Sequence, residues 1–566
     1  MVINKVGFLL FRNDRLAGLL IIAVTTLWFL IIFYHFTPAR VGDWDESLAH
    51  QELQRKIILK YHQFPLWNPY ICGGEPWIAH AKSSFLSPFF LFILIFGTIP
   101  GILMAVFLQV FLGLFGMYCL SRYFKIGYVL SLTNALFFLG LFTILIYFFP
   151  YPIFNVALFP WIYMFFKKSQ ITKRYLFCLS VIFSYLIYSG AYGIFIFASA
   201  VIAVDTLFYV NQKKDFKFLI SLSGFIFTII FLSAVKLFPL LTLLQKYPRY
   251  VKLPLPPAYI DIAKIPNLLR IDFLPDVLGH VLLSGISFFF ILAIITLWKK
   301  NRELVCLNII FMLLFFGDDS PINLWRLLHA LIPIMNDSYQ ALIICVISVL
   351  SLSIGLSIEE LQRRIPTLHK AFSYVRIALF FLVGYLVLGS SSRVFLNRTP
   401  IDYDLSKTQS TFFQTTGKDW KMFESIYYDK GVVNGRDPIG NQIQTSVIPK
   451  DNPGYRGEYF LANNFGKINQ TVFTPEKIEF NLDMFKPDTL VINQNYFPGW
   501  RSSFGKVINH QGLIGVEINK RVPKVSVYYL PNSFITGSII TFSFLLIIIY
   551  AKRKRATRVM DFFNLI

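Results

Sequence analysis

Charged residues are scarce in this chain. Only 15% of its 566 residues are Asp, Glu, Lys or Arg, whereas an ordinary soluble protein carries about 25%. Cysteines are few and scattered, at positions 72, 119, 178, 306 and 345, and no spacing among them matches a zinc motif. No glycine-rich nucleotide-binding motif is present either. These shortages argue against an ordinary soluble enzyme, a disulfide-stapled domain and a zinc site.

Apolar residues, in contrast, are abundant. They make up 55% of the chain, with 61 phenylalanines, and apolar runs long enough to cross a bilayer recur along it. Only helices or closed barrels satisfy backbone polar groups in lipid. Barrel strands alternate apolar and polar residues, which these long runs do not. The composition therefore predicts a polytopic α-helical membrane protein.

The net charge of +22 invites a nucleic-acid interpretation, which the distribution of basic residues argues against. They fall in short clusters between apolar runs, as the positive-inside rule expects of cytoplasmic loops. We therefore predict no nucleic-acid partner. The clusters are Lys167-Lys168, Lys213-Lys214, Lys299-Lys300, Arg363-Arg364 and Lys552 to Arg555.

The same clusters predict a topology of about twelve spans with both termini cytoplasmic. The first run, 16–36, is followed by Thr37-Pro38 rather than a small-residue cleavage site, so we expect an uncleaved span. The apolar piece 85–96 is too short to cross and is expected to be re-entrant or interfacial. The remaining spans are expected at about 102–121, 128–147, 153–166, 174–188, 190–209, 217–235, 279–298, 303–316, 338–357, 371–390 and 532–550.

Four segments are expected on the outer face: 37–101, 236–278, 317–337 and 391–531. The last alternates in period two at 478–482 and 524–528, with Gly, Asn and Pro turns between, which favours a small antiparallel β-sandwich. The predicted organisation is a helical membrane domain over 1–390, a β-rich domain over 391–531, and a final span with a basic tail over 532–566.

The first outer segment begins with three acids, Asp43, Asp45 and Glu46, which are our candidate catalytic residues. One interpretation is helix capping, with Asp43 at the start of a helix over 44–61. The other is a general base at the membrane surface, or a divalent cation such as Mg²⁺ or Mn²⁺ held by Asp43 and Asp45. The spacing does not decide between these roles.

Aromatic and imidazole side chains follow the acids. Trp67, Asn68 and Tyr70 lie in a Pro- and Gly-rich stretch and suit either an interfacial aromatic belt or a face on which a sugar stacks. His80 is a further candidate for substrate binding. The spacings of His50, His62 and His80 match no metal-ligand motif, so we do not expect histidine ligation.

Several outer-face cations are not explained by the positive-inside rule. They suit solvent or lipid head groups, or alternatively a clamp on the phosphate of a lipid-linked substrate. The acidic pair at 318–319 suits a turn, and Asp318 is also a candidate for substrate binding. The cations are Lys82, Lys246, Arg249, Lys252 and Arg326.

Three blocks carry a resemblance to a known family. The first outer loop reads Gly42-Asp43, then Pro65-Leu66-Trp67-Asn68-Pro69-Tyr70, Gly74-x-Pro76 and Ser87-Pro88. The second block is 316–360, and the third runs from Asn495-Tyr496-Phe497-Pro498-Gly499-Trp500 to Tyr529-Leu530-Pro531. Together they resemble bacterial YfhO-type membrane proteins, which are similar to the GT-C glycosyltransferases.

The resemblance implies a GT-C-like fold in the bacterial cytoplasmic membrane, with extracytoplasmic active loops. It implies transfer of a sugar from a polyprenyl-phosphate-linked donor to an envelope glycan, lipid or protein acceptor, with membrane lipids around it. In the family, the catalytic first-loop acid corresponds to Asp43. A transporter or flippase for lipid-linked glycans and a non-catalytic envelope assembly factor are the alternatives. Span interiors nearly free of charge and the lack of an internal repeat argue against transport.

Overall fold

The computed structural model describes most of the chain. The described residues are 2–35, 44–148, 153–246, 291–316, 322, 324, 326–327, 339–368, 371–372, 374–384, 401, 403–406, 411–417, 421–434, 446–519 and 523–563. Of the candidate site residues and cations named above, Asp43, Arg249, Lys252 and Asp318 lie outside this set.

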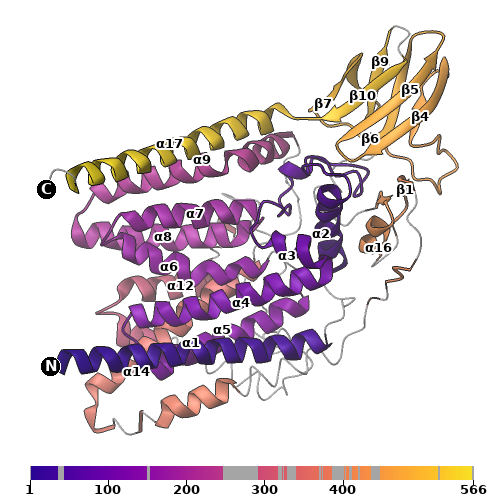
Figure 1. The fold of residues 1–566 in the computed structure, drawn as a ribbon. Helices are drawn as coiled ribbons and strands as arrows, with labels where there is room; N and C mark the ends of the chain where they lie inside the picture. Colours follow the sequence, from indigo (N-terminus) through magenta and orange to yellow (C-terminus); the bar gives the residue numbers. More distant parts are fainter. Residues whose placement is uncertain are drawn as a thin grey trace.

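Apolar helices form a bundle whose members run roughly side by side (Figure 1). Six helices of the described residues are long and apolar enough to cross a membrane, and the chain therefore has the character of a membrane protein. The expected total of about twelve stays a prediction. The six segments are Asp14–Ile31, Thr98–Tyr123, Tyr192–Lys213, Lys217–Lys246, Cys345–Arg364 and Asn532–Ala551.

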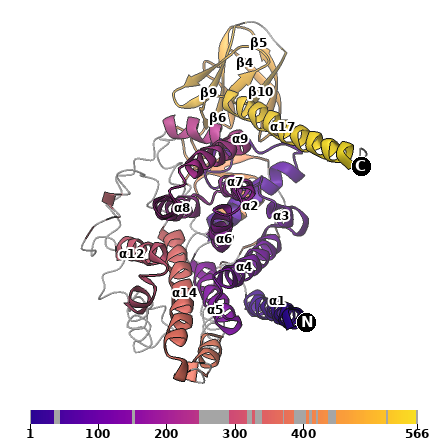
Figure 2. The same cartoon turned by 90° about the vertical axis from the view of Figure 1, so that its left-hand side faces the viewer.

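The described helices of the bundle follow one another in chain order. Their bounds are α1 Val2–His35, α4 Thr98–Tyr123, α5 Tyr128–Phe148, α6 Phe159–Ser169, α7 Arg174–Tyr188, α8 Tyr192–Lys213, α9 Lys217–Lys246, α12 Arg302–Phe316, α14 Tyr339–Arg364 and α17 Asn532–Phe563. Short 3₁₀ turns are η1 Trp77–Ala79, η2 Ile153–Leu158 and η6 Pro366–Leu368. Helices α9 and α17 lie at one edge of the bundle, and α1 and α14 at the other (Figures 1 and 2).

Small residues allow the helices to approach closely. A Cβ built on Gly116 of α4 would lie 2.5 Å from Nε1 of Trp161 on α6. A Cβ on Gly537 of α17 would lie 2.3 Å from the carbonyl oxygen of Ala234 on α9. Close backbone approach increases van der Waals contact, which is the main attraction between helices in lipid. These glycines therefore set the packing of α4 on α6 and of α17 on α9.

The piece 85–96 contains only a short helix, α3 Phe90–Phe96. Seven residues rise about 10 Å, far less than the ~30 Å apolar thickness of a bilayer. Gly97, with φ of 89°, then turns the chain directly into α4. The expectation that this piece is too short to cross agrees with the structure.

The C-terminal region contains the expected β-rich domain. Its sandwich has one sheet of order β4-β5-β10-β7 and a second of order β3-β6-β9-β8, all antiparallel. The strands are β3 Tyr459–Leu461, β4 Gly466–Thr474, β5 Lys477–Met484, β6 Asp488–Asn495, β7 Trp500–Ser502, β8 Lys506–His510, β9 Leu513–Ile518 and β10 Lys524–Tyr529.

The two segments with period-two alternation are strands of the same sheet. Ile478 of β5 lies opposite Val527 of β10, and Phe480 lies opposite Val525. All four are completely buried between the sheets. The alternation therefore marked the inward face correctly.

The sandwich and the chain termini lie at opposite ends of the bundle. Figure 1 shows both termini at one end and the β domain at the other, with α2 Trp44–Leu59 crossing that second end. A smaller piece of the C-terminal region packs directly on α2. It comprises β1 Phe413–Thr415, α16 Met422–Tyr427 and β2 Lys430–Val432, with β1 and β2 parallel. The first outer segment is thus enclosed between bundle and β domain.

Candidate functional site

Helix α2 is polar in composition and yet buried. A buried polar group costs free energy unless it is hydrogen-bonded, so each such side chain on α2 needs a partner. Helix α16, the loop after α2 and the start of α4 supply many of these partners. The buried polar side chains are Asp45, Glu46, Ser47, His50, Gln51, Glu52, Gln54 and Lys56.

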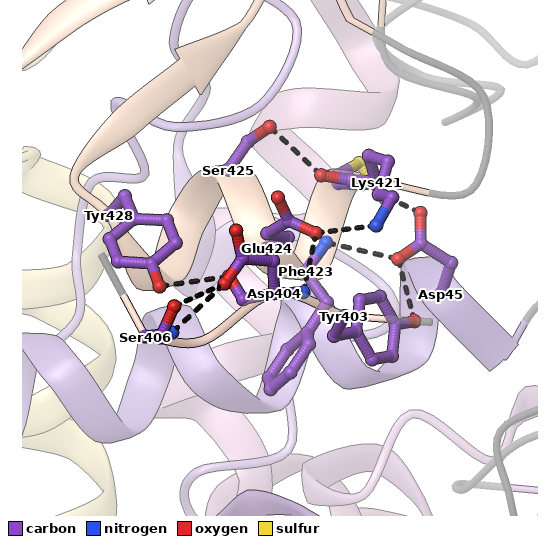
Figure 3. Close-up of polar contacts among 10 residues, drawn as sticks. Asp45, Tyr403, Asp404, Ser406, Lys421, Phe423, Glu424, Ser425 and Tyr428 are labelled. Atoms are coloured by element: carbon purple, nitrogen blue, oxygen red, sulfur yellow. Dashed lines mark hydrogen bonds and ion pairs between the residues drawn. The ribbon is translucent and has the colours of Figure 1, made fainter. Parts of the chain in front are cut away.

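Asp45 binds the start of helix α16 (Figure 3). Its carboxylate accepts hydrogen bonds from the backbone N–H of Met422 at 2.8 Å and of Phe423 at 3.1 Å. The hydroxyl of Tyr403 donates a third bond at 2.9 Å. Lys421, the residue preceding α16, provides no side-chain cap. Asp45 therefore caps α16 from another part of the chain, a structural role that occupies both carboxylate oxygens.

One turn from the C-terminus of α2, Lys56 forms a buried ion pair with Asp429 at 3.1 Å. Its ammonium also donates to the carbonyl of Tyr427 at 2.8 Å. Lys60 pairs with the other oxygen of Asp429, and the hydroxyl of Tyr70 donates to the same carboxylate at 3.0 Å. Burial alone would raise the pKa of Asp429, but the two ammonium groups more than offset it and lower the pKa. This network fastens α2 to the turn between α16 and β2.

Around Glu46, acidic, basic and aromatic side chains lie close together. We call Glu46, His50, Trp77, His80 and Lys82 the Glu46 cluster. The Glu46 carboxylate forms an ion pair with the Lys82 ammonium, and Nε2 of His50 lies 3.9 Å from the same carboxylate oxygen. The Glu46 side chain is 7% exposed and that of Lys82 33% exposed. The carboxylate is therefore enclosed, and the lysine connects the cluster to the surface.

Three rings complete the cluster. Trp77 stacks on His80 with ring centroids 4.7 Å apart, and both rings contact His50, at 5.0 Å and 5.6 Å respectively. The backbone N–H of Lys82 donates to Nδ1 of His80 at 3.1 Å, which places the ring proton of a neutral His80 on Nε2. Among the described residues, the buried indole N–H of Trp77 has no acceptor.

The backbone after His80 is held from several sides. The N–H of Ser84 donates to Gln54 on α2 at 2.8 Å. The ammonium of Lys236 on α9 donates to the carbonyl of Ser83. Gly190, with φ of +76°, passes so close that a Cβ there would lie 2.4 Å from the carbonyl oxygen of Ala81. The backbone that carries His80 and Lys82 is therefore fixed by α2, by α9 and by the α7–α8 turn.

Trp67, Asn68 and Tyr70 are completely buried. The indole N–H of Trp67 donates to Gln494 on β6 at 2.7 Å, and its ring packs on Trp500 at 5.1 Å. Asn68 donates to Glu75 at 2.9 Å within the loop. Their observed contacts join the first outer loop to the β domain and to α16, and their expected role in substrate binding stays a prediction.

The cations expected on the outer face contact different partners where the structure describes them. Lys82 pairs with Glu46, whereas Lys246 lies 4.9 Å from the ring centroid of Phe497 in the β domain. Arg326 is exposed. Because Asp43 and Arg249 lie outside the described residues, convergence of these cations on Asp43 stays a prediction.

Metal binding receives no support from the part of the chain that the structure describes. No group of three or more His, Cys, Asp and Glu side chains there is arranged to hold an ion. Asp45, one of the two expected ligands, uses both oxygens for hydrogen bonds to α16 and Tyr403. A divalent cation held through Asp43 therefore stays a prediction.

The Glu46 cluster combines a carboxylate, an ammonium group and two imidazoles, which suits proton transfer next to an anion. Our sequence interpretation named Glu46, His80 and Lys82 but not the roles of His50 and Trp77. The i,i+4 spacing of Glu46 and His50 on a helix is the signal that would have joined them. No protein-family model matches this chain, and no curated protein matches it as a relative.

Proposed function

We propose that this protein is a membrane glycosyltransferase that uses a polyprenyl-phosphate-linked sugar as donor and an envelope glycan, lipid or protein as acceptor. The observation that supports it most is the Glu46 cluster: an enclosed carboxylate paired with a lysine, at the end of a bundle of apolar helices. A polyprenyl carrier stays in the bilayer, so its phosphate must be met at the membrane surface. The resemblance to YfhO-type and GT-C proteins supports the same chemistry.

In the proposed reaction an acceptor hydroxyl attacks the anomeric carbon of the donor. A carboxylate takes the hydroxyl proton, the new C–O bond forms, and the bond from the anomeric carbon to the phosphate oxygen breaks. Polyprenyl phosphate leaves with the bonding electrons. The transition state carries oxocarbenium character, and the departing phosphate gains negative charge that a cation stabilises.

Asp43 is the proposed general base and Lys82 the proposed phosphate partner. Asp43 immediately precedes α2, so it is one helical turn from Glu46 in sequence. Glu46 holds Lys82 in place and is the alternative base. Asp45 is assigned to neither step, because it caps α16. His80, stacked on Trp77, is proposed to bind the sugar through its Nε2–H.

The test uses full-length protein in lipid nanodiscs with a polyprenyl-phosphate sugar and a candidate acceptor. Asp43→Asn removes the base while keeping its shape, and transfer is expected to fall about 10²–10⁴-fold. Glu46→Gln is expected to weaken transfer through loss of the Lys82 ion pair. Glu479→Gln, a partly exposed carboxylate on β5 that pairs with Lys477 and Lys524, is the matched control and should leave transfer unchanged.

Two outcomes would contradict the proposal. If a folded Asp43→Asn, Glu46→Gln double variant transferred the sugar as fast as the wild type, neither carboxylate would be the general base. Donor that crosses the bilayer without loss of its sugar, in the wild-type protein, would indicate the transport alternative instead. Thermal unfolding of each variant separates lost chemistry from lost folding.

A further inference from the structure

A pocket of about 520 Å³ lies where the β domain meets α9 and α17, and one of its lining residues, Ala79, directly precedes His80 of the Glu46 cluster. Thr242 near the C-terminus of α9 lines one side, and Trp500 and Arg501 of β7 line another. Asn532 and Ser533, the first two residues of α17, complete it. A concave site of this size is suited to a small ligand or a head group.

The ends of α9 and α17 place the pocket where lipid head groups are expected, if both helices cross a membrane as their length and composition allow. Helices α9 and α17 are both long and apolar enough to cross a membrane, and the pocket forms where one ends and the other begins. The β domain covers that end of the pair (Figure 1). A ligand reaching this pocket from the bilayer would therefore present its polar head to the β domain and its tail to the helices.

The chemistry of the lining favours an anion. Arg501 is the charged residue among the described residues that line it, and no carboxylate is among them. Its guanidinium donates to Asn532 at 2.7 Å, which holds it beside the start of α17. The N-terminus of that 32-residue helix carries the positive end of the helix dipole.

Two further observations support a ligand. Trp500 is 6% exposed, and in the described part of the chain its indole N–H has no acceptor. A buried donor of this kind normally has a partner. Below the pocket, Ile539 and Leu546 follow Asn532 at intervals of seven residues, so they share its face of α17. They are 61% and 66% exposed and offer an apolar track for an acyl or prenyl tail.

From these features we infer that the pocket binds the phosphate head group of a membrane lipid, with Arg501 and the first turn of α17 as the anion-binding groups. The tail then lies along the exposed face of α17. This site does not depend on sugar transfer, because none of its lining residues belongs to the Glu46 cluster. Occupancy would couple the β domain to the lipid around α9 and α17.

Native mass spectrometry of the full-length, delipidated protein tests the inference. The protein is titrated separately with phosphatidylglycerol, with polyprenyl phosphate and with diacylglycerol, which lacks a phosphate. At least one phosphate lipid is expected to bind more tightly than diacylglycerol. Tighter binding of phosphatidylglycerol would assign the site to bulk phospholipid, and tighter binding of polyprenyl phosphate would assign it to a carrier lipid.

Variants locate the site. Arg501→Gln keeps a hydrogen-bonding group but removes the charge. This variant is expected to bind the phosphate lipid about tenfold or more weakly than the wild type. Trp500→Phe keeps an aromatic ring, although a smaller one, and removes the indole N–H, and a smaller loss of binding is expected. Lys506→Ala, which removes an exposed charge from neighbouring β8, is the matched control and should bind normally. Unchanged binding by folded Arg501→Gln, or equal binding of diacylglycerol by the wild type, would overturn the inference.

Discussion

Glu458→Gln should remove a pH dependence from the stability of the β domain. Glu458 directly precedes β3, and its carboxyl accepts bonds from the N–H of Gln414 at 2.7 Å and the hydroxyl of Tyr455 at 2.9 Å. Burial raises the pKa of Glu458 from 4.5 to about 7, although these hydrogen bonds lower it in part.

The raised pKa sets the sign and size of the effect. The folded state holds the proton more tightly than the unfolded state, so the stabilisation is complete below the unfolded pKa of 4.5 and is lost as pH rises through about 7. At about 1.36 kcal/mol per pKa unit, a shift from 4.5 to about 7 corresponds to about 3 kcal/mol. Glutamine keeps the acceptor oxygen and carries no charge at any pH.

Pulse proteolysis of the full-length protein in urea, with cleavage followed in the β domain, measures this difference. Between pH 5 and pH 8.5 the unfolding free energy of Glu458→Gln relative to wild type is expected to rise by about 2.5 kcal/mol, in favour of the variant at high pH, because a small part of the effect is already present at pH 5. Groups that titrate elsewhere cancel in the comparison. A wild-type-minus-variant difference that stays flat across this range would refute the reasoning.

Two substitutions probe the packing of the first outer loop. Gly190→Ala is expected to lower stability by about 1–3 kcal/mol, because φ is +76° and the new Cβ would meet the carbonyl of Ala81. Gly18→Ala, where nothing lies within 4 Å, is its control in a thermal unfolding comparison, and equal melting of the two would contradict the assignment. Trp67→Ala should cost about 3–5 kcal/mol through loss of buried ring contacts. It should also speed protease cleavage of the β domain, and wild-type cleavage rates would show that Trp67 does not fasten that domain.

The sequence predicted those features that depend on local pattern. Apolar runs located the helices, and period-two alternation at 478–482 and 524–528 located β5 and β10. The piece 85–96 was expected to be too short to cross, and the structure gives it only a seven-residue helix. In each case the information lies within a few residues, where the 3.6- and 2-residue periods can be detected.

The buried position of α2 could not be predicted from such local patterns. Its polar composition is typical of a solvated interfacial helix, but Asp45 binds Met422 and Lys56 binds Asp429, partners more than 350 residues away. The same limit applies to Trp67. From the sequence, a tryptophan in this loop is compatible with an interfacial aromatic belt, whereas the structure places it against Gln494 and Trp500 of the β domain. Sequence alone named Glu46 and Lys82 as candidates, but their pairing required the fold.

The capping of α16 by Asp45 has a consequence for biogenesis. The carboxylate and the amide of Met422 are 377 residues apart, so a ribosome adding about 5–20 residues per second needs roughly 20–75 s to produce the partner. Until then Asp45 and Lys56 of α2 lack the partners that α16 and Asp429 supply in the folded protein. Completion of the first outer loop is thus deferred to the last quarter of synthesis. A nascent chain that stops before Met422 would therefore leave two charges on α2 without the partners that bury them in the finished protein.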